Sequence, residues 1–235
     1  MLRSATQASH RAERRAHIRN LNMIRIKQIE CNNLAENCFI VSDDTKECMI
    51  VDCGAISPFE HEFISKYIEE NGLKVVLHAL THGHFDHCMG AQWISDTYGI
   101  RPTIHERDAD LYKNCNQLAA AMGYPNLTLQ MPPIGRCVNN GDTVSFGNTT
   151  FRVIHTPGHS HGCVVYYCEE EGVAFTGDTL FKGSIGTTSF PEGSMFQMTQ
   201  SLRILCKLPE ETKLFPGHGP ATTMGYEGAT NPFLE

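Results

Sequence analysis

Four residues with metal-ligand side chains stand close together in the segment 81–87, THGHFDH. In an extended chain, side chains two residues apart point to the same side, so His82 and His84 can bind one ion together. Asp86 and His87 follow where the chain is predicted to turn into a helix, which points them elsewhere. This arrangement favours two adjacent metal ions over one.

Three further candidate ligands lie in separate short motifs, each directly after a glycine. They are His159 in TPGHSH, Asp178 in TGDT and His218 in PGHGP. Each motif follows a predicted strand, and turns at strand ends commonly carry binding residues. An isolated histidine or aspartate in a loop is usually a solvated side chain, so spacing alone leaves both interpretations open for these three. The density of the first cluster favours a metal.

Hydrophobic periodicity predicts the elements that must position these residues. Residues 24–29 alternate apolar and polar side chains, which is typical of a half-buried strand. Further strands are predicted at 38–41, 48–51, 74–80, 143–146, 150–155, 164–168, 173–175 and 213–215. Helices are predicted at 58–70, 87–98, 109–122 and 195–207, and a loop at 126–141. Strand-rich halves, each followed by helices, predict an α+β fold in which two mixed β-sheets pack face to face with helices on the outer faces.

Composition excludes several classes of protein. Hydrophobic residues make up 41% of the 235 residues and charged residues 19%, as in soluble globular proteins. Residues 1–22 hold five arginines and one glutamate, which leaves 14 basic and 25 acidic residues in the remainder, a net charge of −11. An acidic body argues against binding to nucleic acid. No apolar run approaches the roughly 18 residues that indicate a membrane span, so no membrane partner is expected.

The first 22 residues are basic and almost free of acids, as organellar transit peptides are. The first strand pattern begins at Met23, and nothing before it needs burial, so we predict a disordered extension over 1–22 and one domain over 23–235. The ten cysteines are scattered without a C-x-x-C pair, which favours reduced thiols. A cytoplasmic protein is therefore expected, with organellar targeting as the minor alternative. Oligomeric state has no signature in the sequence.

The ordered set of motifs resembles the metallo-β-lactamase superfamily, whose pattern is H-x-H-x-D-H, then a distant histidine, a bridging aspartate and a final histidine. The resemblance runs from about Met23 to the C-terminus. Residues 175–181 (FTGDTLF), 183–186 (GSIG), 216–223 (PGHGPATT) and 231–234 (NPFL) are similar to glyoxalase II, or hydroxyacylglutathione hydrolase, and above all to its short bacterial relatives. The resemblance implies the αββα sandwich of the metallo-β-lactamase fold.

The same resemblance implies a role for each candidate. His82, His84 and His159 would bind the first ion, Asp86, His87 and His218 the second, and Asp178 would bridge them. The implied cofactors are two divalent metal ions, zinc first, with iron or manganese as alternatives. Asp52, in VDCG, matches a family position that supports the ligands from behind, and His155 is expected to do the same.

The implied substrate is a small molecule, with a glutathione thioester as the first candidate. A water shared by the two ions would lose its proton near neutral pH and attack the thioester, and Asp86 would be the catalytic residue that orients it. Lys182, Thr187 and His161 are the candidate substrate-binding residues. Only 17 residues follow His218, too few for the helical domain that helps glyoxalase II hold glutathione, and Thr187 stands where a basic residue is common. Both departures weaken the glutathione assignment.

Other activities on the same fold stay open. A persulfide dioxygenase-like enzyme would use one iron, and a lactonase would use the same attacking hydroxide. A β-lactamase is disfavoured because Asp178, and not a cysteine, stands at the bridging position. A non-enzymatic binding module is disfavoured because all seven ligand positions hold competent residues. The sequence therefore predicts a metal-dependent hydrolase acting on ester or thioester bonds.

Overall fold

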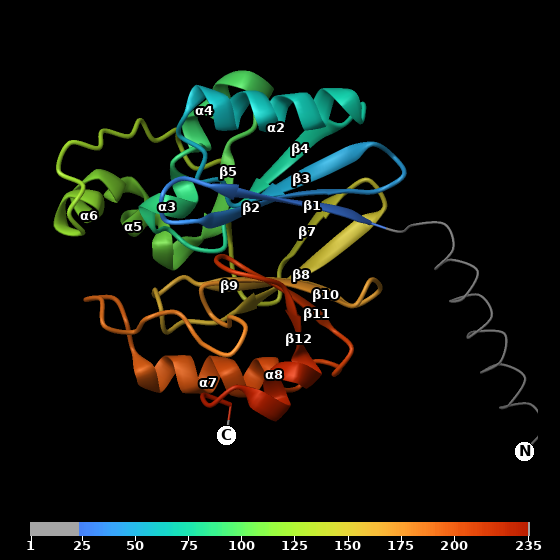
Figure 1. The fold of residues 1–235 in the computed structure, drawn as a ribbon, viewed down its shortest axis with the longest axis vertical. Helices are drawn as coiled ribbons and strands as arrows, with labels where there is room; N and C mark the ends of the chain where they lie inside the picture. The colour runs from blue at the N-terminus through green and yellow to red at the C-terminus, as the bar shows by residue number, and fades with distance from the viewer. Residues whose placement is uncertain (1–23, 235) are drawn as a thin grey trace, which may run out of the picture.

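Two six-stranded sheets pack against each other in the computed structural model, which describes residues 24–234 (Figure 1). The predicted extension 1–22 lies outside the described residues. The first sheet has, in spatial order, β1 (Arg25–Cys31), β2 (Glu36–Ser42), β3 (Glu47–Val51), β4 (Lys74–Ala79), β5 (Pro102–His105) and β6 (Arg136–Val138). The second has β12 (Thr222–Thr223), β11 (Lys213–Pro216), β10 (Val173–Gly177), β9 (Val164–Cys168), β8 (Thr149–His155) and β7 (Thr143–Phe146).

Both sheets are mixed. In the first, β1, β2 and β3 pair antiparallel, and β4, β5 and β6 continue parallel to β3. In the second, β7 to β10 pair antiparallel, whereas β11 runs parallel to β10. Parallel neighbours end at the same edge of a sheet. The loops that follow β3 and β4 therefore meet at one edge, as do those after β10 and β11.

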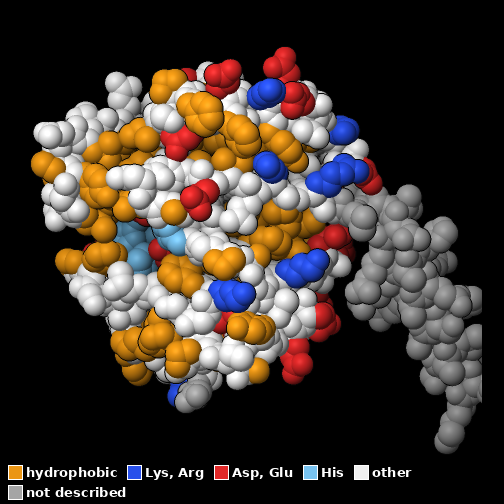
Figure 2. Space-filling model, in the orientation of Figure 1, with side chains coloured by type: hydrophobic (Ala, Val, Ile, Leu, Met, Phe, Trp, Pro, Cys, Tyr) orange, Lys and Arg blue, Asp and Glu red, His pale blue; other side chains and the backbone are white. Residues whose placement is uncertain are grey.

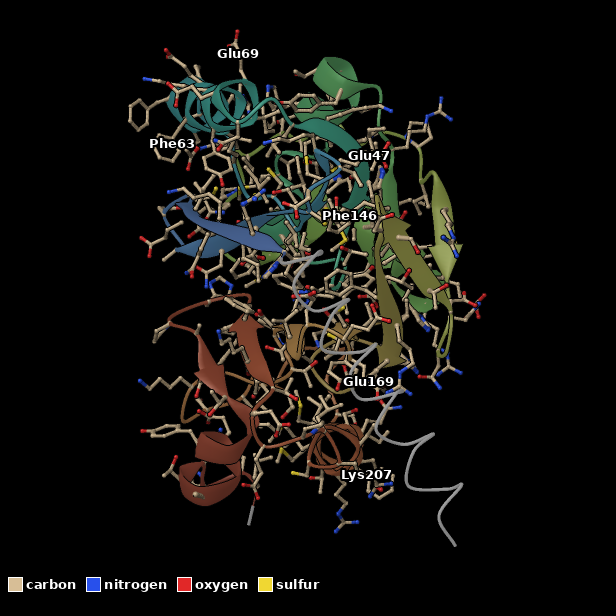
Figure 3. All side chains as sticks on the ribbon, turned by 90° about the vertical axis from the view of Figure 1, so that its right-hand side faces the viewer. Glu47, Phe63, Glu69, Phe146, Glu169 and Lys207 are labelled. Atoms are coloured by element: carbon tan, nitrogen blue, oxygen red, sulfur yellow. The ribbon has the colours of Figure 1, made fainter. Side chains whose placement is uncertain are left out.

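Apolar side chains fill the space between the sheets. Phe39 of β2 and Phe175 of β10 are buried with their ring centroids 5.1 Å apart, and Phe151 of β8 packs on Phe175 at 5.8 Å. Burial of one such side chain contributes about 1.5–3 kcal/mol. Phe146 of β7, labelled near the middle of the molecule in Figure 3, is 2% exposed and belongs to the same core. This core fixes the position of one sheet against the other, and with it the position of the strand ends.

Helices cover the outer faces (Figure 1). On the first sheet lie α2 (Pro58–Glu70) and α4 (Ala91–Tyr98), which bury Ile64 and Ile94. On the second lie α7 (Met195–Leu205) and α8 (Met224–Thr230), with Met198 and Leu202 of α7 buried as their spacing predicts. The predicted αββα sandwich is confirmed. No helix among residues 24–234 has the length and apolar character that crossing a membrane requires.

Two segments that were each predicted as one unbroken helix are divided in the structure, so these two predictions are wrong. The helix expected over 87–98 is two helices, α3 (Phe85–Cys88) and α4, separated at Gly90. The backbone N–H of Gly90 donates to the carbonyl of Cys53 at 2.8 Å, and a Cβ at Gly90 would collide with the Cys53 thiol. The helix expected over 109–122 is two helices, α5 (Ala109–Lys113) and α6 (Cys115–Ala121), which meet at Asn114, and a 3₁₀ turn, η1 (Glu106–Asp108), precedes them.

The prediction of an uninterrupted loop over 126–141 is also wrong. It contains β6, which pairs with β5 through the partners Ile104 and Cys137. Neither strand was predicted, and neither were β12 and α8. These strands have two to four residues, and periodicity needs a longer segment to be visible.

Candidate metal centre

The seven candidate ligands gather at one edge of the sandwich and come from both sheets. His82 and His84 follow β4, and Asp86 and His87 lie in α3. The other three follow the ends of second-sheet strands, His159 after β8, Asp178 after β10 and His218 after β11. Figure 2 shows histidine side chains in a hollow between the two halves of the molecule, flanked by hydrophobic side chains. The four motifs of the sequence thus form one cluster.

Two glycines of these motifs are required by close approach. A Cβ at Gly83 would lie 3.0 Å from the carbonyl oxygen of Asp108 and the amide nitrogen of Tyr112. A Cβ at Gly217 would collide with Oδ1 of Asp178 and with the ring of His87. Any side chain here would therefore push apart the elements that carry the ligands.

The first group of candidate ligands consists of His82, His84 and His159. Nε2 of His82 lies 3.0 Å from Nδ1 of His84, and that Nδ1 lies 2.7 Å from Nε2 of His159. The three nitrogens converge within 4.8 Å of one another, and all three side chains are buried. Nitrogen ligands that each lie about 2.0–2.1 Å from a tetrahedral zinc ion are separated from one another by distances comparable to these.

The second group consists of Asp86, His87 and His218. Nε2 of His87 lies 3.2 Å from Nε2 of His218, which is 3.4 Å from Oδ2 of Asp86. Asp178 lies between the groups, with Oδ1 3.4 Å from Nε2 of His87 and Oδ2 3.4 Å from Nε2 of His159. The carboxylate therefore reaches both groups, as a bridging ligand must.

The electrostatics of the first group suit a cation. Burial, followed by the charges of neighbouring histidines, lowers the pKa of His82 well below its ordinary value. Burial also lowers the pKa of His159 to about 4. Both rings are thus neutral at pH 7, and a neutral imidazole nitrogen is the form that binds a metal.

The acidic side of the cluster also fits. Burial would raise the pKa of Asp178, but His87 and His159 beside it hold that pKa well below its ordinary value. Burial would lower the pKa of His87, yet Asp178, Asp86 and Asp52 raise it well above its ordinary value. Oδ1 of Asp178 is buried and accepts no hydrogen bond from residues 24–234. A divalent cation would satisfy this oxygen and replace the proton on His87, so the residues present fit divalent ions.

Residues behind the second group orient its histidines. Asp52 accepts hydrogen bonds from the amide and hydroxyl of Thr81, each at 2.7 Å, and its Oδ2 lies 3.0 Å from Nδ1 of His87. Nδ1 of His218 lies 3.1 Å from the carbonyl oxygen of Leu34. The structure therefore places Asp52 where the resemblance implied, whereas the contribution of the 32–35 turn has no signal in the sequence.

The residues behind the first group differ from the expectation, because Thr187 was predicted to bind substrate and Glu192 was not a candidate. Nδ1 of His159 lies 2.7 Å from the carbonyl oxygen of Thr187, so Thr187 contacts the cluster through its backbone. Nε2 of His84 lies 2.9 Å from Oε1 of Glu192, in the turn before α7. Such partners fix which ring nitrogen carries the proton and aim the other at the metal.

Asp108 is a second buried carboxylate that was missed. It accepts hydrogen bonds from the amide of Gly83 at 2.9 Å, the hydroxyl of Ser160 at 2.6 Å and the amide of Gly162 at 2.5 Å. Burial raises the pKa of Asp108. The residue ties the His82–His84 segment to the loop that carries His159.

Three predicted residues lie apart from the ligand side chains. The His155 ring stacks on His105 with centroids 4.2 Å apart, and its Nε2 lies 2.8 Å from the carbonyl oxygen of His161. His155 thus braces the loop and, within the described residues, makes no hydrogen bond to the seven candidates. The His161 side chain is exposed. Nζ of Lys182 lies 5.4 Å over the ring of Tyr226 in α8.

Sequence and structure comparisons agree with this geometry. Residues 32–218 match the family described as the Metallo-beta-lactamase superfamily, and the chain belongs to that superfamily. It is 34% identical over 212 residues to hydroxyacylglutathione hydrolase GloC of Haemophilus influenzae, which covers 89% of this chain and 97% of that protein. The predicted superfamily and its glyoxalase II-like character are confirmed.

Two solved structures are close in fold and related in sequence. The B3 metallo-beta-lactamase BLEG-1 superposes with a TM-score of 0.82 at 32% identity, covering 89% of this chain and 99% of that one. TTHA1623 in a di-iron-bound form superposes with a TM-score of 0.78 at 34% identity, covering 88% and 100%. Together the relatives and the histidine–aspartate cluster support a metal-dependent hydrolase.

Proposed function

We propose that this protein is a binuclear metal-dependent thioesterase of the glyoxalase II type. His82, His84 and His159 would hold one divalent ion, the second group would hold another, and Asp178 would be a ligand shared by both. The observation that carries the proposal is the buried carboxylate of Asp178, which stands 3.4 Å from a histidine nitrogen of each group. Zinc is the first candidate for both ions, because nitrogen and carboxylate ligands suit it, and iron or manganese are the alternatives.

When bound, the two ions supply Lewis-acid activation of a water and of the substrate carbonyl. The protein's own contribution begins with Asp86, whose carboxylate is 14% exposed and can accept a hydrogen bond from the attacking water. His218 stands 3.4 Å from that carboxylate and limits its orientations. A thiol leaving group has a free pKa of about 8.5, so it departs as a thiolate without a strong general acid.

The surroundings of the cluster support a substrate that brings an apolar part close to the histidines. The Phe190 ring lies 5.2 Å from the His84 ring and 5.7 Å from the His159 ring. The Phe181 ring lies 6.2 Å from the His218 ring. Aromatic side chains exclude water from the reacting carbonyl and accept an acyl chain or thioether. A 2-hydroxyacyl thioester of glutathione is the first substrate to test, in line with the activity in the name of the GloC relative.

A hydrolysis panel on protein of measured metal content tests this proposal. The substrates are a 2-hydroxyacyl-glutathione thioester, a thioester of a small neutral thiol, a lactone and a β-lactam, and oxygen uptake is followed with glutathione persulfide. We expect two ions per chain and the largest kcat/KM for a thioester. One iron per chain with oxygen uptake would overturn the proposal in favour of a persulfide dioxygenase. A β-lactam as the best substrate would place the activity with that of BLEG-1, and a lactone with the lactonases.

A further inference from the structure

Residues 182–194, which form most of the connection between β10 and α7, contact two of the three histidines of the first group. The carbonyl oxygen of Thr187 lies 2.7 Å from Nδ1 of His159, and Oε1 of Glu192 lies 2.9 Å from Nε2 of His84. Phe190 packs edge-on against both imidazole rings. One segment of the second half of the chain therefore contacts ligands that come from both sheets.

Glu192 is held in place by the backbone around it. The amide of Gly193 donates to the carbonyl of Phe190 at 2.8 Å, which closes a turn around Glu192. The amide of Ser194 donates to the carbonyl of Gly158 at 2.8 Å, and the Ser194 hydroxyl accepts from the amide of Gln197 at 3.3 Å to cap α7. The side chain is 14% exposed, and that of His84 is 4% exposed. This is a fixed contact between two enclosed side chains, unlike a surface ion pair.

The contact determines which nitrogen of His84 is free. Nδ1 of His84 faces the convergence point, 3.0 Å from Nε2 of His82 and 2.7 Å from Nε2 of His159. A carboxylate only accepts hydrogen bonds, so Glu192 keeps a proton on Nε2 and leaves the lone pair of Nδ1 for a cation. The other tautomer would place an N–H among the nitrogens of the first group and leave Nε2 facing a carboxylate.

The partners of the other histidines in the first group are neutral. Nδ1 of His82 lies 3.1 Å from the hydroxyl oxygen of Thr81, and His159 bonds a backbone carbonyl. Hydrogen bonds to an ionised group are roughly twice as strong as neutral ones. In the second group, Asp52 makes the corresponding charged contact to His87 at 3.0 Å. Each group thus has one histidine supported by a carboxylate, and for the first group that carboxylate is Glu192.

We propose that Glu192 is a positioning residue that fixes the tautomer and ring orientation of His84 and thereby strengthens ion binding by the first group. The proposal rests on the metal site put forward above, and it is independent of which thioester the protein hydrolyses.

The test compares Glu192→Ala and Glu192→Gln with wild type and with Glu69→Ala. Glu69 is an exposed residue that points away from the body of the molecule on α2 (Figure 3), so its loss controls for removal of a charge. The affinities of the two ions are measured by competition with a chromophoric chelator, and the visible spectrum of the cobalt-substituted protein reports ligand geometry. Thermal unfolding of the metal-free protein checks the fold.

We expect Glu192→Ala to weaken one of the two ions by about 10–100-fold and to change the cobalt spectrum, while the other ion changes little. Glu192→Gln keeps an acceptor oxygen without the charge, so it should restore part of the affinity. If both ions bind Glu192→Ala with wild-type affinity and spectrum, the inference is wrong. If Glu192→Ala does not fold, the Glu192→Gln variant provides the test. Wild-type metal affinity in a folded Glu192→Gln variant would show that the charge of Glu192 does not strengthen ion binding, and the inference would be wrong.

Failure of the underlying metal site has a different signature. A His84→Ala variant should lose the ion of the first group altogether. If wild type and His84→Ala bind metal alike, the site itself is wrong, whereas a loss in His84→Ala without any change in Glu192→Ala contradicts only the role of Glu192.

Discussion

The two groups of candidate ligands differ in how far they are enclosed. In the first group the side chains of His84 and His159 are each 4% exposed, whereas in the second Asp86 is 14% and His218 is 25% exposed. The first group and the segments that carry it are contacted by residues from loops far apart in the chain, among them Asp108, Thr187 and Glu192. His87 of the second group is fully buried, and the carbonyl oxygens of Leu34 and Ala35 lie within 3.2 Å of Nδ1 of His218, so the exposure of this group is confined to Asp86 and His218. We infer that the first group would hold an ion more firmly, and that the second would hold one closer to the substrate.

Asp178 belongs to both groups, so its replacement should give the largest effect. Asp178→Ala removes the carboxylate that stands between His87 and His159, and both ions should bind more weakly. Loss of a residue behind a ligand costs about 10–100-fold in affinity or activity, so loss of the shared ligand should exceed about 100-fold in kcat/KM. Metal content and kcat/KM are measured together, with the 90% exposed Asp110→Ala as control. A variant that kept both ions and full activity would refute the bridging assignment.

Asp108 supports the first group alone, so its replacement should separate the two groups. Asp108→Ala leaves the amides of Gly83 and Gly162 and the hydroxyl of Ser160 without their acceptor. An unsatisfied buried donor costs about 1–3 kcal/mol, so we expect a loss of about 3 kcal/mol in unfolding free energy, with relaxation offsetting part of the total. Urea unfolding measures this loss. Ser160→Ala removes one of the three bonds and should cost about 1 kcal/mol. Equal weakening of both ions in Asp108→Ala would contradict the division into two groups.

His78 of β4 is a buried histidine outside the candidate metal centre, and it differs from the histidines inside the centre in lacking a hydrogen-bond partner within the described part of the chain. His78 is fully buried, neither ring nitrogen has a hydrogen-bond partner among residues 24–234, and burial lowers its pKa to about 3. The unfolded chain binds this proton below about pH 6.5, whereas the folded chain stays neutral. Stability is therefore unaffected above that pH and falls by about 1.4 kcal/mol per pH unit as pH drops toward 3.

Replacing His78 should remove this acid sensitivity. Between pH 6.5 and 4.5, metal-free His78→Leu should lose about 2–3 kcal/mol less unfolding free energy than wild type. Urea unfolding at the two pH values gives the difference, and the other titrating groups cancel because both proteins share them. Parallel loss of stability in the two proteins would show that His78 is protonated or hydrated in the folded state.

Local patterns explain which parts of the molecule were predictable. The ligand motifs were visible because four candidates stand together at 82–87 and the other three each follow a glycine, and Gly217 shows why, since a side chain there would collide with Asp178. The strands were visible because a half-buried strand alternates with period two. Glu192 carries no such mark: it lies 108 residues from His84 in the chain, in a turn whose sequence is typical of any helix start.

The errors have the same origin. The helix break at Gly90 depends on a hydrogen bond to Cys53, which lies in the loop after β3. The segment 136–138 forms the strand β6 because it pairs with β5. His155, for which the resemblance implied a place behind a ligand, stacks its ring on that of His105. In each case a contact distant in sequence decided the local structure.

The smallest expected effect concerns Lys182, a predicted substrate-binding residue. The ammonium group lies 5.4 Å over the ring of Tyr226, an exposed cation–π contact that contributes about 0.5–1 kcal/mol. Lys182→Ala should therefore lower stability by about that amount and change kcat/KM for a glutathione thioester by less than about threefold. Thermal unfolding and steady-state kinetics measure the two effects, with Lys66→Ala on α2 as control. A KM that rises tenfold for the glutathione thioester, but not for the neutral thioester, would show that Lys182 leaves Tyr226 to bind the glutathione carboxylate. The glutathione assignment would then gain the basic contact that Thr187 does not supply.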